Sequence, residues 1–256
     1  MKFTRRPDGR VLRIGHRGAA AVEPENTIRS FEEAIAIGVD FIEFDVLDLR
    51  DGTLVLAHSD DLVEVSHGAR PGRVRRLGLG DLRAAAPDLP TLDEALTFFA
   101  QESVGLHVDV KSRVQGRGVA AALRRHDLVE RSVVSSFWTH TLRDVRTEEP
   151  ELAVALTYPE DRYGLAHRRV LAPFALPTAR LLARALPRRL PRWLRALGSP
   201  VAMLHYAVLS RAAVERCHAH GAAVWAWTVS DEALLEQVTA LGVDGVISDD
   251  PRIFGG

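Results

Sequence analysis

Short apolar runs typical of β-strands recur along the whole chain, and amphipathic stretches typical of helices lie between most of them. The strand-like runs are 11–16, 41–46, 106–111, 133–137, 152–157, 202–206, 223–229 and 243–248. Eight strand-helix units in 256 residues predict one domain, 1–256, with an α/β fold of the (β/α)8 TIM barrel class. A doubly wound open sheet is the alternative, but nothing like G-x-G-x-x-G follows the first run.

Two connections are longer than a barrel usually needs. The first, 59–90, follows the second strand, and we predict a short insertion there, near the site. The second, 158–200, precedes the sixth strand and carries nine arginines against two acids, interleaved with leucines. We favour a helical lid over the barrel mouth with a solvated arginine face, and the alternative is a basic amphipathic helix whose segment 176–197 rests on an anionic membrane.

Composition limits the class of protein further. The formal net charge of −1 argues against a nucleic-acid binder. The single cysteine, Cys217, excludes an internal disulfide and fits a reducing compartment. Because no apolar run follows the basic N-terminal residues and no segment reaches membrane-spanning length, we expect a cytoplasmic protein, with peripheral membrane contact through 158–200 as the one exception. The sequence leaves the oligomeric state open.

The strand at 41–46 carries two acids on one face, because Glu43 and Asp45 alternate with apolar residues. Two close carboxylates are costly to bury unless a proton or a cation offsets their repulsion, and Mg²⁺ or Ca²⁺ prefers such oxygen ligands. A turn at Asp51 and Gly52 would close a short hairpin and bring His58 back roughly opposite Asp45. The alternative is an edge hairpin whose acids face water.

Further polar residues stand at the carboxyl ends of other predicted strands, where a barrel places its active site. The first strand ends in His16 and Arg17, and the third ends in Asp109 and Lys111, which alternate onto one face. Trp227 lies near the end of the seventh strand. Two histidines, three acids, two cations and a metal suit a phosphate ester: the cations offset phosphoryl charge while one histidine removes a proton and the other protonates the leaving group. A monoesterase and a phosphodiesterase both fit this set.

Several motifs in register narrow the choice. The chain resembles the glycerophosphodiester phosphodiesterase family, within the phospholipase C-like phosphodiesterase superfamily. The resemblance rests on His16-Arg17-Gly18, Pro24-Glu25-Asn26-Thr27, Gly38-Val39-Asp40-x-x-Glu43-x-Asp45-Val46, Asp51-Gly52 with His58, Pro90-Thr91-Leu92-Asp93-Glu94, Ser136-Phe137, Trp227-Thr228-Val229 and Gly245-Val246-Ile247-Ser248-Asp249-x-Pro251.

The resemblance implies a metal-dependent barrel that hydrolyses glycerophosphodiesters to an alcohol and glycerol 3-phosphate. It also implies residue roles: His16 and His58 as the acid/base pair, Glu43, Asp45 and Asp109 as ligands of Mg²⁺ or Ca²⁺, Arg17 and Lys111 as phosphate contacts, and Trp227 as a pocket residue. Two departures stand out. Asp109 replaces the usual glutamate, and Ser59 intervenes between His58 and Asp60.

Other activities stay open at this point. The Asp-x-Lys form of the third strand resembles sphingomyelinase D-like phospholipases, so a phospholipase D-like activity on lysophospholipid or sphingomyelin headgroups is the alternative enzyme. A non-catalytic phosphodiester-binding protein is a further alternative, although pure binding needs no acid/base pair. Either water or a neighbouring substrate hydroxyl can attack, and the hydroxyl would form a cyclic phosphate.

The remaining conspicuous residues have mainly structural interpretations. Asn26 or Thr27 caps the helix that follows. His107 lies deeper in the barrel than the acids and is expected to be a hydrogen-bonded core histidine. Of the two tryptophans that alternate onto one face, Trp225 and Trp227, one is expected only to pack. For His205, at the end of the sixth strand, packing and substrate contact stay equally open.

Overall fold

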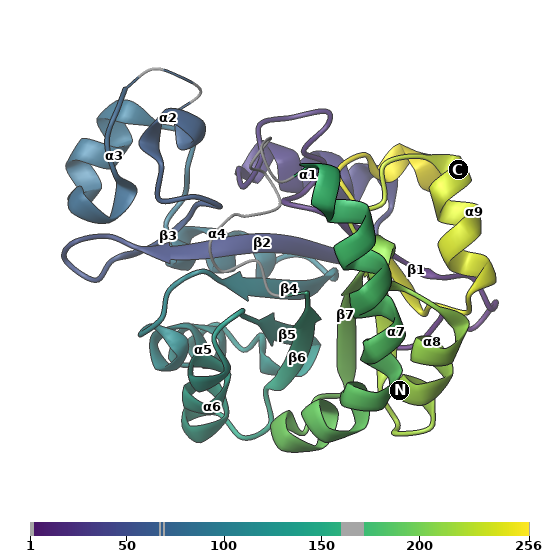
Figure 1. Cartoon of the computed structure of the whole chain (residues 1–256). Helices are drawn as coiled ribbons and strands as arrows, with labels where there is room; N and C mark the ends of the chain where they lie inside the picture. Colours follow the sequence, from purple (N-terminus) through teal and green to yellow (C-terminus); the bar gives the residue numbers. More distant parts are fainter. Residues whose placement is uncertain (1–2, 67, 69, 160–171, 256) are drawn as a thin grey trace.

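In the computed structural model, which describes residues 3–66, 68, 70–159 and 172–255, the sheet closes into a barrel (Figure 1). Strands pair in the order β1-β9-β8-β7-β6-β5-β4-β2-β3, and an additional β1–β2 pairing closes the ring. All pairings are parallel except that of β3 with β2. The predicted (β/α)8 barrel is therefore confirmed, and the doubly wound alternative is wrong.

Each predicted strand is present, with boundaries that shift by a few residues. The barrel strands are β1 Leu12–Gly15, β2 Phe41–Asp48, β4 Gly105–Val110, β5 Ser132–Ser135, β6 Ala153–Tyr158, β7 Val201–His205, β8 Ala223–Trp227 and β9 Gly245–Ser248. The return strand of the predicted hairpin is β3, Leu54–Leu56.

Apolar side chains fill the amino-terminal end of the barrel. Phe3, Phe41 and Trp225 pack with ring centroids 4.9–6.2 Å apart, and the Trp225 indole donates a hydrogen bond to the Phe3 carbonyl. Trp225 is thus the tryptophan with a purely structural role, buried in the core at this end of the barrel. Because this end is filled, polar groups collect at the opposite end, where the strands finish.

Helices surround the barrel. They are α1 Ile28–Ile37, α4 Leu92–Phe99, α5 Gly116–Arg125, α6 Thr139–Glu148, α7 Ala172–Leu197, α8 Arg211–His218 and α9 Glu232–Ala240. Of these, α1, α4, α8 and α9 begin at a residue whose side chain caps the helix. Thr27 caps α1 by accepting a hydrogen bond from Ser30 N, and Gly38 ends it with φ 93°, a conformation that favours glycine. Thr91 and Glu94 form a capping box at the start of α4.

The connection after β3 folds as a small lobe on the β2–β3 hairpin (Figure 1). It contains α2 Leu62–Val65, the 3₁₀ turn η1 Val74–Arg76 and α3 Leu79–Ala85. Its own apolar cluster includes Leu62, Val74 and Leu82 and continues onto the hairpin. Arg75 connects the lobe to the barrel mouth, because its guanidinium lies 3.0 Å from Asp48 Oδ1 and 3.3 Å from the Lys111 carbonyl.

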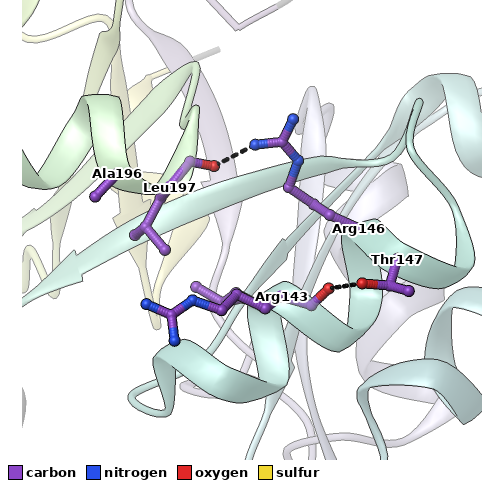
Figure 2. A pocket seen from close by; sticks show the side chains of 6 residues that line it. Arg143, Arg146, Thr147, Ala196 and Leu197 are labelled. Carbon is purple, nitrogen blue, oxygen red and sulfur yellow. Dashed lines mark hydrogen bonds between the residues drawn. The ribbon is translucent and has the colours of Figure 1, made fainter.

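The arginine-rich connection contains α7, which packs against the barrel between β6 and β7; residues 160–171 of the connection lie outside the described part. Leu186, Leu190 and Leu194 of α7 are buried in the main core. Arg146 of α6 donates a 2.6 Å hydrogen bond to the Leu197 carbonyl at the carboxyl end of α7, beside a cavity between the two helices (Figure 2). Among the described residues, no helix combines the length and the apolar character needed to cross a membrane.

Candidate active site

Three carboxylates meet at the carboxyl ends of two adjacent strands. Glu43 and Asp45 of β2 and Asp109 of β4 are 3%, 0% and 8% exposed, so the edge-hairpin alternative with water-facing acids is wrong. The parallel register places Asp45 beside Asp109. One oxygen from each of the three residues lies within 4.8 Å of the others. The predicted juxtaposition of the three acids is present in the structure.

The charge balance in this cluster suits a bound cation. Burial and the neighbouring Asp45 raise the pKa of Glu43. Burial opposes the charge of Asp45 as well, but Lys111 and Arg17 hold the pKa of Asp45 well below its usual range. Among the described residues, Asp45 Oδ1 is also buried without a hydrogen bond, although Lys111 Nζ lies 2.9 Å away in an ion pair. The acids therefore fit a hard divalent metal, which would satisfy that oxygen and favour the ionised form of Glu43.

Asn26 positions the central acid of the cluster. Its amide Nδ2 donates to Asp45 Oδ2 at 3.0 Å, and its Oδ1 accepts from Asp45 N at 3.0 Å. Asn26 adopts φ 59°, in the left-handed region that asparagine tolerates better than most residues. Thr27 is the helix cap, so the sequence interpretation of Asn26 as a second capping candidate missed its contact with Asp45.

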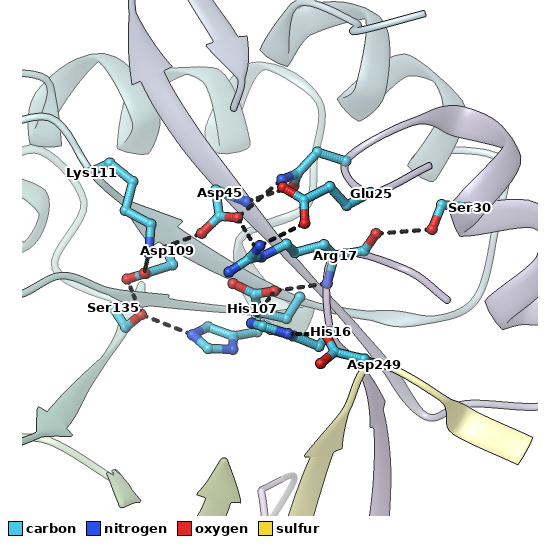
Figure 3. Close-up of polar contacts among 12 residues, drawn as sticks. His16, Arg17, Glu25, Ser30, Asp45, His107, Asp109, Lys111, Ser135 and Asp249 are labelled. Atoms are coloured by element: carbon cyan, nitrogen blue, oxygen red, sulfur yellow. Dashed lines mark hydrogen bonds and ion pairs between the residues drawn. The ribbon is translucent and has the colours of Figure 1, made fainter. Parts of the chain in front are cut away.

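His16 lies between two carboxylates (Figure 3). Its Nδ1 is 2.5 Å from Asp249 Oδ1, and its Nε2 is 3.8 Å from Glu43 Oε2. Burial disfavours the charged imidazole, but Glu43 and Asp249 outweigh it and raise the pKa of His16. The position of Asp249 just after the last predicted strand was the signal in the sequence for a role at the barrel mouth.

His58 approaches the cluster from the β2–β3 hairpin. Ala57 N donates to the Asp45 carbonyl at 3.1 Å, so Ala57 is paired with Asp45 and His58 lies one residue beyond. Burial lowers the pKa of His58 to about 4. A cavity beside the site is lined by His58, Arg17 and Glu25. The carboxylate of Asp60, the acid that Ser59 separates from His58 in the sequence, accepts hydrogen bonds from the Arg73 guanidinium and from Arg75 N in the insertion.

The two cations assigned to the phosphate lie against the acids. Arg17 Nε is 3.1 Å from Asp45 Oδ2, while its terminal nitrogen donates to Glu25 at 2.6 Å. Lys111 Nζ bridges Asp45 and Asp109. These carboxylates raise the pKa values of both cations despite burial. Both cations therefore stay charged at the place where a phosphoryl group would meet the metal ligands.

Aromatic residues border the mouth at β7 and β8. The His205 ring lies 4.9 Å from the Trp227 ring and 4.4 Å from Tyr206, and its Nδ1 accepts from Ala207 N. Trp227 Nε1 is buried without a hydrogen-bond partner among the described residues. His107 is a hydrogen-bonded core histidine, as expected, with its Nε2 2.8 Å from Ser135 Oγ.

Comparison with known proteins identifies the family. The model of the glycerophosphoryl diester phosphodiesterase family matches residues 16–253. The chain belongs to this family. A glycerophosphodiester phosphodiesterase from Caldanaerobacter subterraneus subsp. tengcongensis is 28% identical over 95% of this chain and 96% of its own length. A probable glycerophosphodiester phosphodiesterase 2 from Mycobacterium tuberculosis is also 28% identical, over 95% of this chain and 89% of its own length.

Solved structures support the same fold for this family member. A phosphodiesterase from Oleispira antarctica, solved in complex with the product sn-glycerol-3-phosphate, has a TM-score of 0.74 at 24% identity and covers 93% of each chain. A protein from Silicibacter pomeroyi described as a putative glycerophosphoryl diester phosphodiesterase has a TM-score of 0.76 at 24% identity, covering 98% of this chain and 93% of its own. Family membership, barrel and acidic cluster together identify a glycerophosphodiester phosphodiesterase and do not favour the phospholipase D-like or binding-only alternatives.

Proposed function

We propose that the chain hydrolyses glycerophosphodiesters to an alcohol and glycerol 3-phosphate with His16 and His58 as its acid/base pair. The observation that carries this assignment is the pair of imidazoles at the acidic cluster: Glu43 lies 3.8 Å from His16, and His58 follows Ala57, whose N–H donates to the Asp45 carbonyl at 3.1 Å. One histidine removes a proton from the attacking group, either water or a neighbouring substrate hydroxyl, and the other protonates the leaving alkoxide. Attack by water gives glycerol 3-phosphate directly, whereas attack by the substrate hydroxyl gives a cyclic phosphate that a second step with water opens to glycerol 3-phosphate. Asp249 holds His16 through Nδ1, which leaves Nε2 directed toward the acids.

The charged residues around the acids bind and orient the phosphodiester. A divalent cation held by Glu43, Asp45 and Asp109 would supply charge stabilisation to the phosphoryl oxygens. Arg17 and Lys111 add two fixed positive charges at the same place, and their burial strengthens these interactions relative to water. Trp227 lines the mouth beside His205 and excludes water from one side of the site.

The test is release of glycerol 3-phosphate from glycerophosphocholine by the purified protein. Release is expected to stop with EDTA and to return when Mg²⁺, Ca²⁺ or Mn²⁺ is restored, because the acids are costly to bury together without a cation. The ion that restores the highest rate identifies the preferred metal. Release at an undiminished rate in EDTA would contradict the metal dependence, and no release with any ion would contradict this substrate assignment.

Peripheral contact with anionic membranes is a further part of the proposal, and it uses the arginine face of α7. Arg184, Arg188, Arg189, Arg192 and Arg195 are exposed, and positions 181–197 contain no acid. Three leucines of this segment, Leu186, Leu190 and Leu194, are buried against the barrel and cannot contact a membrane, whereas Leu181 is exposed. Each exposed arginine near an anionic surface contributes attraction that falls off within a Debye length. A cytoplasmic location stays a prediction from sequence.

Vesicle pelleting tests this contact. We expect the protein to pellet with phosphatidylglycerol-containing vesicles at low salt and to be released at about 1 M salt, where the Debye length is roughly 3 Å. It should not pellet with pure phosphatidylcholine vesicles. Glutamine at four of the α7 arginines should abolish pelleting. Glutamine at four exposed arginines on other elements should preserve it, and suitable positions are Arg29, Arg83, Arg117 and Arg252. Equal pelleting of the two variants would contradict a role for α7.

A further inference from the structure

A buried chain of hydrogen bonds runs from the barrel interior to the third acid of the cluster (Figure 3). Ser135 Oγ, on β5, lies 2.6 Å from Asp109 Oδ1, and His107 Nε2, on β4, lies 2.8 Å from Ser135 Oγ. Ser135 and His107 are 1% and 4% exposed. The β4–β5 register places Ser135 directly beside Asp109. These contacts connect Ser135 and His107, which have no assigned role in the proposed reaction, to Asp109, which is a proposed metal ligand.

The chemistry of the three groups determines which atom donates in each bond. An ionised carboxylate has no proton, so the single hydroxyl proton of Ser135 is directed to Asp109. The lone pairs of Ser135 then accept from His107, which requires the neutral His107 tautomer with its proton on Nε2. Consistent with this tautomer, Nδ1 is buried and has no hydrogen-bond partner within the described residues, whereas Nε2 lies 2.8 Å from Ser135 Oγ.

We propose that Ser135, supported by His107, is a positioning residue that holds the Asp109 carboxylate in the orientation needed for a metal ligand. Lys111 binds the other oxygen, Oδ2, so the two partners together fix the plane of the carboxylate. The support matters here because Asp109 replaces the glutamate that the family resemblance implied. A side chain one methylene shorter reaches less far, and a rotation away from the cluster would remove it as a ligand. The inference rests on the proposed metal-dependent function.

Calorimetric titration with Mn²⁺, after chelator treatment, tests the role of Ser135. Ser135→Ala should raise the dissociation constant for Mn²⁺ by about 10- to 100-fold, the range found when a residue supporting a metal ligand is lost. Ser132→Ala is the matched control: Ser132 lies on the same strand, is 0% exposed, and donates a 2.6 Å hydrogen bond to the Leu128 carbonyl, away from the acids. It should lose a similar amount of thermal stability but bind Mn²⁺ like the wild type.

Two further outcomes separate this inference from the proposed function. If the wild type and Ser135→Ala bind Mn²⁺ equally, the inference is overturned and the metal-dependent function stands. If the wild type binds no divalent ion, both are overturned. Should Ser135→Ala fail to fold, Ser135→Cys keeps a weak donor of similar size and should show a smaller loss of Mn²⁺ affinity than alanine would cause; wild-type affinity in this variant would also overturn the inference.

Discussion

Replacing His16 by alanine is expected to lower the turnover of glycerophosphocholine by about 10²- to 10⁴-fold, the range that positioned acid/base groups usually contribute. His58→Ala should have an effect of similar size, because one imidazole removes a proton from the attacking group and the other donates a proton to the leaving group. The loss should appear in kcat and kcat/KM alike, since a proton-transfer group acts in the transition state rather than in substrate binding. Steady-state rates at saturating metal measure it.

Histidine replacements elsewhere separate this effect from damage to the fold. His220 is exposed, and within the described residues its side chain bonds only to the Arg216 carbonyl of α8, so His220→Ala should leave turnover unchanged. Asp249→Asn should lower turnover less than His16→Ala, because the imidazole remains but loses the carboxylate that orients it. A folded His16→Ala protein with near-normal turnover would remove His16 from the proposed mechanism.

Asp45→Asn is expected to abolish metal-dependent activity by lowering metal affinity at least about 100-fold, more than the loss of a supporting residue usually causes. The same change should lower the melting temperature of the metal-free protein. Arg17 and Lys111 hold the pKa of Asp45 far below normal, so the ionised form stabilises the fold at neutral pH, and a neutral amide cannot replace it. This contribution is present above the unfolded pKa of Asp45 and is lost as the pH falls through its folded value.

Asp48→Asn provides the matched comparison for this prediction. Asp48 lies on the same strand and makes a 3.0 Å ion pair with Arg75 of the insertion, outside the acidic cluster. It should retain wild-type metal affinity while losing a little stability. Titration calorimetry measures the metal affinity of both variants, and thermal unfolding after chelation measures their stability. Wild-type metal affinity in Asp45→Asn would show that Asp45 is not a ligand.

Much of the fold could be predicted because its signals are local. Alternation with period two identified the strands and placed Glu43 and Asp45 on one face, and amphipathic stretches between them predicted the helices. Once eight strand-helix units imply a barrel, the carboxyl ends of the strands must converge, so His16, Asp45 and Asp109 could be grouped without coordinates. The roles of these residues stay predictions until the variants are measured.

The contacts that depend on closure of the barrel could not be predicted in this way. Asp249 reaches His16 across 233 residues of sequence, and Asn26 reaches Asp45 from the turn before α1. No periodic pattern in the sequence predicts either pairing, because each depends on which loops the closed barrel brings together.

Periodicity and motifs were sufficient to predict the order of strands and helices, the shared face of the acids on β2, and the family. The partners that orient the site residues became known only from the folded chain: Asp249 orients His16, Asn26 orients Asp45, and Ser135 contacts Asp109. Packing of α7 on the barrel likewise buries Leu186, Leu190 and Leu194 and leaves the five arginines between positions 184 and 195 exposed. The physical reason is that side-chain periodicity records which face of an element is apolar, whereas the partner of a polar atom depends on distances set by packing between elements.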